Sequence, residues 1–123
     1  MFLSTKNYLA QFHHLIEVGM HVSLAVAFWG RGADKLIETA WAGKSLRILF
    51  DLGNGGTNPE VIRSLLEISP RLPGLELRIA DELHAKVAVS ETTAIIGSAN
   101  CSVNGLGLEG TECAGWQEAG VMI

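Results

Sequence analysis

The sequence contains no long hydrophobic run. Its longest apolar stretch, Val22 to Trp29, is interrupted by Ser23 and is far shorter than the roughly 20 residues that a membrane-spanning helix needs. The first residues, Met1 to Lys6, also lack the basic region and long apolar region of a secretory signal. The sequence therefore predicts a protein without a membrane span, and the cytoplasm is its default location.

Positive charge and cysteine are scarce as well. The 9 Lys and Arg residues against 13 Asp and Glu give a formal net charge of -4, so the chain lacks the basic excess that drives non-specific binding to phosphate backbones. Any contact with nucleic acid would have to be local. Cys101 and Cys113 have neither Cys-x-x-Cys spacing nor a nearby histidine at ligand spacing. We expect free thiols and no zinc site, although the spacing neither requires nor excludes a disulfide.

Apolar residues are abundant and make up 48% of the 123 positions. This composition is typical of a globular protein and is too apolar for a disordered one. The length predicts a single domain over residues 1–123 with at most one active site. The abrupt end of the last predicted strand also fits a fragment of a longer protein.

Hydrophobic periodicity alternates along the chain between the helical and the strand pattern. Ser4 is placed to cap a helix over about residues 5–18, which ends at Gly19. Val22 to Phe28 is almost continuously apolar, which is typical of a central strand covered on both faces. This alternation predicts an α/β layered fold. The other predicted elements are helices over about 32–42 and 59–69, and strands over 46–50, 75–79, 84–90, 93–99 and 118–123.

One region combines a nucleophile, a cation and hydrogen-bond donors within a short span. His84 and Lys86 are two residues apart, so they project from the same face of a predicted strand, as do Ser98 and Asn100 on the next one. The side chains converge if His84 lies opposite Asn100 and Lys86 lies opposite Ser98. This register leaves residues 91–93 as a three-residue loop. A slip by one residue would send Ser98 and Asn100 to the other face.

Such a face suits phosphoryl transfer. A lysine and an amide can bind the non-bridging oxygens of a phosphate while a neutral imidazole attacks the phosphorus. Fixed donors then stabilise the charge that builds up on the equatorial oxygens. This chemistry requires no metal ion, and the sequence offers no carboxylate cluster that would bind one. We therefore expect neither a metal nor another cofactor.

A glycine-rich loop precedes the helix that begins near residue 59. Asn58 is placed to cap this helix, and Pro59 is its first residue. The backbone N–H groups of Gly55, Gly56, Thr57 and Asn58 are candidates to bind a phosphate at the helix N-terminus. The alternative is that the glycines form only a tight connection.

The segment around His84 resembles the phospholipase D superfamily, whose signature is His-x-Lys-x4-Asp followed six residues later by Gly-Ser-x-Asn. Glu91 occupies the aspartate position, and its spacing to the Gly-Ser-x-Asn segment is one residue shorter, with the missing residue in the predicted turn. The resemblance implies a layered fold with a mixed central sheet flanked by helices. The matching residues are His84, Lys86, Gly97, Ser98 and Asn100.

The resemblance also implies a mechanism. In superfamily enzymes one histidine attacks phosphorus to form a phosphohistidine, and a second histidine protonates the leaving oxygen. This chain has one such motif, so the resemblance implies a homodimer with a shared active site or a fragment whose partner motif lies elsewhere. It further implies that Lys86, Ser98 and Asn100 assist His84 and that Glu118 orients the His84 ring. The resemblance also implies that Gly97 is a substrate-binding residue.

Three functions follow from this reading. The first is a metal-independent phosphodiesterase, favoured as a nuclease because the chain is short, has a single motif and lacks membrane-seeking segments. The second is a phospholipid-directed phosphodiesterase. The third is a binding or assembly domain of a larger protein, with little or no activity because the motif is shortened. The other histidines, His13, His14 and His21, lack ligand spacing, and we expect them to be surface or core residues.

Overall fold

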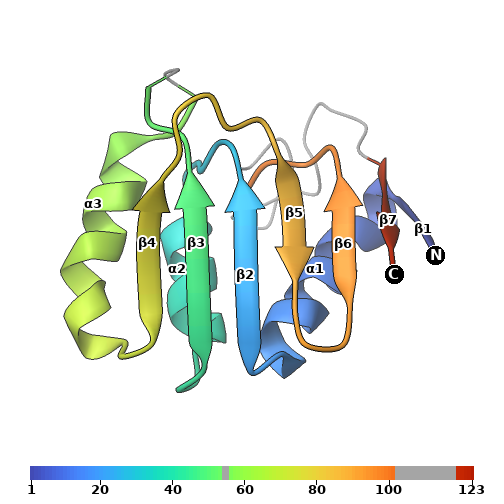
Figure 1. Ribbon diagram of the computed structural model, residues 1–123, viewed down its shortest axis with the longest axis horizontal. Helices are drawn as coiled ribbons and strands as arrows, with labels where there is room; N and C mark the ends of the chain where they lie inside the picture. Colours follow the sequence, from blue (N-terminus) through green and yellow to red (C-terminus); the bar gives the residue numbers. More distant parts are fainter. Residues whose placement is uncertain (54–55, 102–118) are drawn as a thin grey trace.

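The computed structural model of this chain describes residues 1–53, 56–101 and 119–123. Within these ranges the strands form one mixed sheet in the order β1-β7-β6-β5-β2-β3-β4 (Figure 1). β2, β3 and β4 run parallel, whereas β5, β6, β7 and β1 join through antiparallel pairs. The elements are β1 (Phe2–Ser4), α1 (Thr5–Val18), β2 (His21–Val26), α2 (Ala33–Ala40), β3 (Ser45–Phe50), α3 (Pro59–Ile68), the 3₁₀ turn η1 (Ser69–Arg71), β4 (Leu75–Ile79), β5 (Lys86–Val89), β6 (Ala94–Gly97) and β7 (Ala119–Met122).

The helices pack against one face of the sheet. α2 and α3 connect parallel strands that step in the same direction across the sheet, and right-handed crossovers then place both helices on the same side (Figure 1). Each presents buried apolar residues at helical spacing, such as Leu36 and Ala40 of α2 and Val61 and Leu65 of α3. The predicted α/β layered fold is therefore confirmed. None of the described helices is long and apolar enough to cross a membrane.

The local sequence predicts where α1 ends and where α3 begins. α1 spans the predicted residues, and Gly19 donates its N–H to the Leu15 carbonyl at 3.0 Å. At the start of α3, Asn58 Oδ1 accepts the N–H of Glu60 at 2.9 Å, and Pro59 fills the first helical position. The N-terminal strand β1 was not predicted. It forms through its pairing with β7, at the opposite end of the chain.

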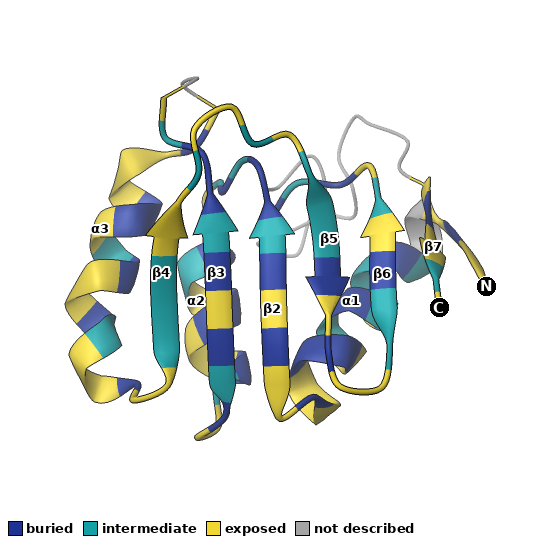
Figure 2. Ribbon diagram, in the orientation of Figure 1, coloured by how far each residue is buried: buried dark blue, intermediate teal, exposed yellow. Residues whose placement is uncertain are grey.

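The other face of the sheet is open in the described part of the chain. β2 lies between β5 and β3, as expected of a central strand, but its side chains alternate between buried and exposed (Figure 2). The expectation that β2 is covered on both faces is therefore wrong, because α1, α2 and α3 all lie on one side. A cavity of about 390 Å³ lies on the open face, and its lining includes Ser23, Arg47, Glu76 and Val87.

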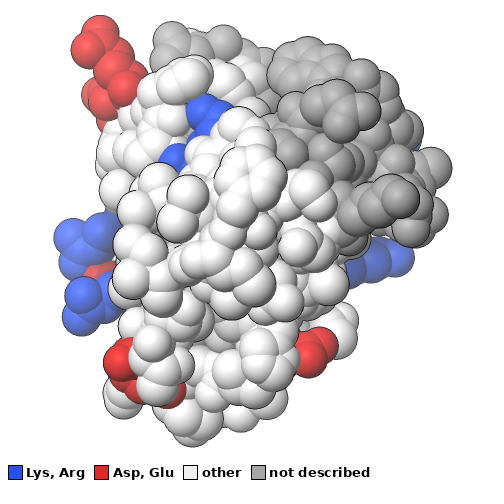
Figure 3. Space-filling view, turned by 90° about the vertical axis from the view of Figure 1, so that its right-hand side faces the viewer, with Lys and Arg blue, Asp and Glu red and all other residues white. Residues whose placement is uncertain are grey.

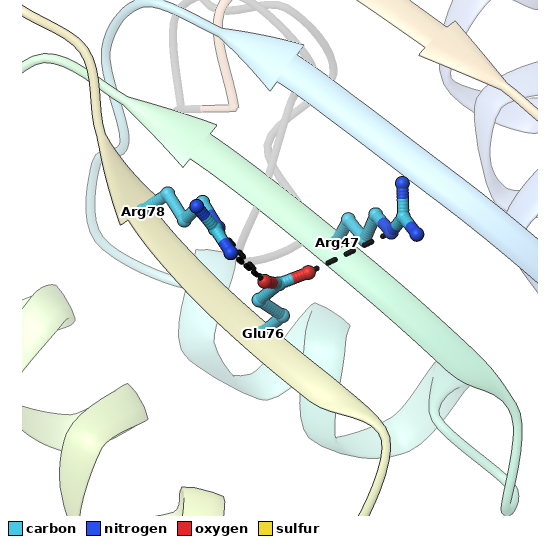
Figure 4. Close-up of polar contacts among 3 residues, drawn as sticks. All are labelled: Arg47, Glu76 and Arg78. Atoms are coloured by element: carbon cyan, nitrogen blue, oxygen red, sulfur yellow. Dashed lines mark hydrogen bonds and ion pairs between the residues drawn. The ribbon is translucent and has the colours of Figure 1, made fainter.

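The open face is charged on one side and apolar on the other. On β3 and β4, Glu76 Oε2 lies 3.6 Å from Arg47 Nε, and Glu76 Oε1 accepts from Arg78 Nε at 2.8 Å (Figure 4). These exposed ion pairs contribute little stability, typically about 1 kcal/mol or less. On β7 and β6, Val121 lies opposite Ile96, and both side chains are exposed. Among the described residues on the side of the molecule toward β1, most of the surface is uncharged (Figure 3).

A buried lysine binds the C-terminal end of α1. Lys44 is only 4% exposed, and its ammonium donates to the carbonyl oxygens of Ile16 and Glu17, the latter at 2.8 Å. These carbonyls belong to the last turn of α1, where no further helical N–H group can reach them. Burial lowers the pKa of Lys44. The side chain thus fixes the end of α1 to the segment that leads into β3.

Replacing this lysine should destabilise the fold. Lys44→Met keeps the apolar stem but leaves carbonyl oxygens of α1 without their donor, so we expect the free energy of unfolding to fall by about 1–3 kcal/mol. Urea denaturation followed by circular dichroism measures this change. The matched control is Lys35→Met, which removes an exposed lysine of α2 and should change stability by less than about 0.5 kcal/mol. Equal effects of the two substitutions would show that the Lys44 contacts are not stabilising.

Candidate functional site

Three of the predicted site residues, His84, Lys86 and Asn100, lie near one edge of the sheet, where several strands end. β2, β3, β4 and β6 end, and β5 begins, at the upper edge in Figure 1. Val26 at the end of β2 lies opposite Lys86 at the start of β5, and the N–H of Ala27 donates to the carbonyl of Ala85 at 2.9 Å. The His84-to-Lys86 segment is thereby fixed beside the end of β2. Ligands of open α/β sheets bind at this kind of edge.

His84 and Lys86 are in direct contact. The Lys86 ammonium donates to the backbone carbonyl of His84 at 2.8 Å and lies 3.4 Å from its ring nitrogen Nδ1. His84 is exposed, whereas Lys86 is partly buried. A cation beside an exposed imidazole is an arrangement that can bind an anion and present a nucleophile to it.

Phe28 contacts both Asn100 and His84. The backbone N–H of Phe28 donates to Asn100 Oδ1 at 3.3 Å. The Phe28 ring meets the His84 ring edge to face, with 6.5 Å between the ring centroids and 86° between the planes. Phe28 therefore links Asn100 to His84, and Lys86 contacts His84 directly. Phe28 was missed because an aromatic residue at the end of an apolar strand is typical of the core.

The predicted register of the β5–β6 hairpin is wrong by one residue. Ala88 lies opposite Ile95, not Ile96, and the connection is a two-residue turn closed by the N–H of Ser90 donating to Thr93 O at 2.8 Å. β5 begins after His84, and β6 ends at Gly97, so both strands are shorter than predicted. Asn100 consequently lies in a segment after β6, where its side chain contacts Phe28, and it does not pair with His84 across the strands.

Ser98 and Gly97 have roles in packing the sheet. The Ser98 hydroxyl accepts the N–H of Ala119 at 3.1 Å and donates to the carbonyl of the same residue at 3.2 Å, which joins β6 to β7. A Cβ atom on Gly97 would overlap the ring of Tyr8, which is buried between α1 and the sheet. These contacts place neither residue beside His84.

In the described part of the glycine-rich loop after β3, Gly56 contacts the site. A Cβ atom on Gly56 would lie 2.5 Å from two carbons of the Phe28 ring. Thr57 is buried, and its hydroxyl donates to Asp51 O at 2.6 Å and accepts the N–H of Trp29 at 3.2 Å. The Asn58 side chain caps α3. The loop residue Gly55 and the predicted ring-orienting residue Glu118 lie outside the described residues.

Cys101 follows Asn100 and takes no part in this arrangement. It is a free, fully buried thiol, and burial raises its pKa, so it is not a nucleophile near neutral pH. Its carbonyl accepts the N–H of Gly30 at 2.7 Å, which fixes the segment after β6 beside the segment after β2. Cys113 lies outside the described residues. In the described ranges no group of three or more His, Cys, Asp or Glu side chains could bind a metal ion.

Glu91, at the aspartate position of the signature, lies at the opposite edge of the sheet from His84. Its carboxylate accepts the N–H of Met20 at 2.9 Å and the N–H of His21 at 3.1 Å. The hydrogen bonds from Met20, from its own backbone and from His21 lower the pKa of Glu91 to about 2. Glu91 therefore fixes the β5–β6 turn to the junction between α1 and β2, away from His84.

This hydrogen bonding makes stability depend on pH. The folded-state pKa of Glu91 lies below the unfolded value of about 4.3, so its contribution is complete above that pH and is lost as the pH falls through about 2. Glu91→Gln should therefore lower the urea midpoint at pH 7, and the gap to the unmodified protein should close between about pH 4.3 and pH 2. Glu38→Gln, on the exposed side of α2, is the control. A gap that is the same at pH 7 and pH 2 would contradict a role for the Glu91 charge.

Comparison with known proteins relates this chain to others through its structure. No protein-family model matches the sequence, and no curated protein matches it. Among solved structures, the chain is similar to Nuc, a phospholipase D family member from Salmonella typhimurium, with a TM-score of 0.69 and 20% identity over 100% of this chain and 80% of that chain.

Two further structures share the fold over parts of larger chains. TrmBL2, an archaeal chromatin protein, matches with a TM-score of 0.59 and 14% identity over 98% of this chain and 45% of that chain. The polyphosphate kinase of Porphyromonas gingivalis matches with a TM-score of 0.61 and 16% identity over 99% of this chain and 22% of that chain. At these identities the comparisons show a phospholipase D-like fold.

Proposed function

We propose that this chain is a metal-independent phosphodiesterase that acts through a phosphohistidine at His84 and cleaves nucleic acid. The observation that carries the proposal is that His84 contacts Lys86 directly and is linked to Asn100 through Phe28, at the carboxyl edge of a phospholipase D-like sheet. Nuc, which is similar to this chain over 100% of the length of this chain, is a phospholipase D family member. Fold alone does not determine function, so the proposal depends on these side chains.

In the proposed reaction, Lys86 and the Asn100 amide bind the non-bridging oxygens of a phosphodiester. His84 Nε2 forms a bond to phosphorus while the bond from phosphorus to the leaving oxygen breaks. A second, protonated imidazole gives its proton to that oxygen. Water then attacks the phosphorus of the phosphohistidine and passes a proton to the second imidazole. The bond between Nε2 and phosphorus breaks, which releases a phosphomonoester and regenerates His84. In this scheme Glu118 orients the His84 ring by accepting a hydrogen bond from Nδ1.

The second imidazole is proposed to be His84 of a second copy of the chain. None of His13, His14 and His21 has a lysine two residues later. His84 is exposed at the edge of the sheet, so a second copy can approach it. A two-fold axis at this edge would place identical residues on opposite sides of one phosphorus, as in-line displacement requires.

The nucleophile determines how hydrolysis responds to a chelator. Cleavage of single-stranded DNA and of a chromogenic phosphodiester should continue at the same rate in excess EDTA, because an imidazole attacks. His84→Ala should lower the rate by about 1,000-fold or more, whereas His14→Ala, an exposed histidine of α1, should leave it unchanged. Activity that EDTA abolishes and a divalent ion restores would refute the mechanism. Faster cleavage of phosphatidylcholine vesicles than of DNA would refute the nuclease assignment.

Mixed dimers test whether the active site is shared. The unmodified chain and His84→Ala are unfolded together, mixed at different ratios and refolded. If each site needs His84 from both copies, activity should follow the square of the unmodified fraction, so an equal mixture retains about one quarter. A linear dependence, with about one half retained in an equal mixture, would show that each chain carries a complete site. Mixtures with His14→Ala serve as the control for refolding yield.

A second candidate function is DNA binding without hydrolysis. It is favoured by the likeness to TrmBL2, whose structure is described as showing a novel mode of DNA binding. In that case a gel-shift assay should show a complex with DNA that persists in His84→Ala, and no condition should yield cleaved product. The net charge of -4 does not separate this candidate from the nuclease, because both would bind DNA through a local excess of cations.

A further inference from the structure

Phe28 contacts two of the residues in the proposed mechanism at once. It lies two residues beyond the end of β2, and its ring is partly buried. The edge-to-face contact with His84 has a geometry that aromatic pairs favour, because the positive edge of one ring meets the negative face of the other. Apart from the Lys86 ammonium near Nδ1, the His84 side chain is exposed, so the contact with Phe28 helps to restrict the plane of the imidazole.

The Phe28 backbone also determines which way the Asn100 amide faces. A backbone N–H can only donate, so the atom that meets it at 3.3 Å must be the amide oxygen, Oδ1. The NH₂ group of Asn100 is then the end turned away from Phe28. That group has the donors that a non-bridging phosphate oxygen needs.

Gly56 in turn fixes the place of the Phe28 ring. A Cβ atom at position 56 would lie 2.5 Å from Cγ and Cδ1 of Phe28 and 2.7 Å from Cε1, closer than carbon atoms approach in proteins. The glycine-rich loop therefore packs directly on the ring, and a larger residue there would force the ring to move. Gly56, Phe28 and His84 form a chain of contacts from this loop to the proposed nucleophile.

We propose that Phe28 is a positioning residue for the phosphodiester cleavage assigned above: its ring sets the plane of the His84 imidazole, its N–H sets the orientation of the Asn100 amide, and Gly56 keeps the ring in place. The kinetic consequences of this inference rest on the proposed function. The contacts of Phe28 with His84 and Gly56 can be measured separately, without any activity. Misplacing a catalytic group by about 1 Å can lower a rate by up to about 100-fold.

Substitutions of Phe28 separate positioning from mere packing. Phe28→Leu removes the ring and should lower kcat by about 10- to 100-fold with a much smaller change in KM, because Lys86 still binds phosphate. Phe28→Tyr keeps the ring and should restore most of kcat. Phe2→Leu, an exposed aromatic residue of β1, is the control and should leave kcat unchanged. Equal kcat values for Phe28→Leu and the unmodified protein would overturn the inference.

The chain of contacts is tested by a double substitution. Gly56→Ala should lower kcat because its methyl group displaces the Phe28 ring. In Gly56→Ala/Phe28→Leu that ring is absent, so kcat should be no lower than in Phe28→Leu alone, since both changes act on the same contact. If the two reductions multiply, Gly56 does not act through Phe28 and this part of the inference is wrong.

Proton NMR of the histidine ring follows the contacts without any activity. The His84 ring signals, identified by their absence in His84→Ala, should shift in Phe28→Leu and in Gly56→Ala, whereas those of His14 should not. If they shift in a protein that cleaves no phosphodiester, the positioning contact stands and the proposed function fails. If the unmodified protein is active and the His84 signals and kcat are unchanged in Phe28→Leu, the proposed function stands and the positioning role is refuted.

Discussion

The antiparallel pairing of β5 with β2 is the constraint on which the site depends. β2, β3 and β4 form a parallel unit with its connecting helices on one face, but this unit alone contains neither His84 nor Asn100. β5 enters the sheet on the other side of β2, with Lys86 opposite Val26. This register places the segment before β5 at the carboxyl end of β2, where Phe28 lies. A shift of the pairing by one residue would turn Lys86 to the other face of the sheet.

The sequence predicts the elements better than their register. The β5 residues Val87, Ala88 and Val89 and the β6 residues Ala94, Ile95 and Ile96 are apolar on both faces, so alternation does not indicate which residues pair. The register is determined by the turn. Ser90 Oγ accepts the N–H groups of Thr92 and Thr93 at 3.3 and 3.2 Å, and Glu91 binds the backbone before β2. The hydrogen bond from Met20 to Glu91 joins residues about 70 positions apart, and no local sequence pattern predicts it.

The predictions that succeed and those that fail differ in how local their causes are. Asn58 and Pro59 determine the start of α3 through hydrogen bonds and backbone geometry within a few residues, so its start is readable from sequence. β1 has three residues and becomes a strand only through β7 at the other end of the chain. His84 and Lys86 are recognisable by their spacing, whereas Phe28 becomes part of the site only through contacts with residues more than 50 positions later.

The position of the Lys86 ammonium sets a condition on the proposed reaction. The ammonium lies 3.4 Å from Nδ1 of His84, the nitrogen to which the proposal assigns the hydrogen bond with Glu118. An ammonium has only donors, so it cannot hydrogen-bond to a protonated Nδ1. In the proposed reaction the phosphate oxygens accept from Lys86 instead. Nδ1 then keeps its proton for the carboxylate, and Nε2 presents its lone pair to phosphorus.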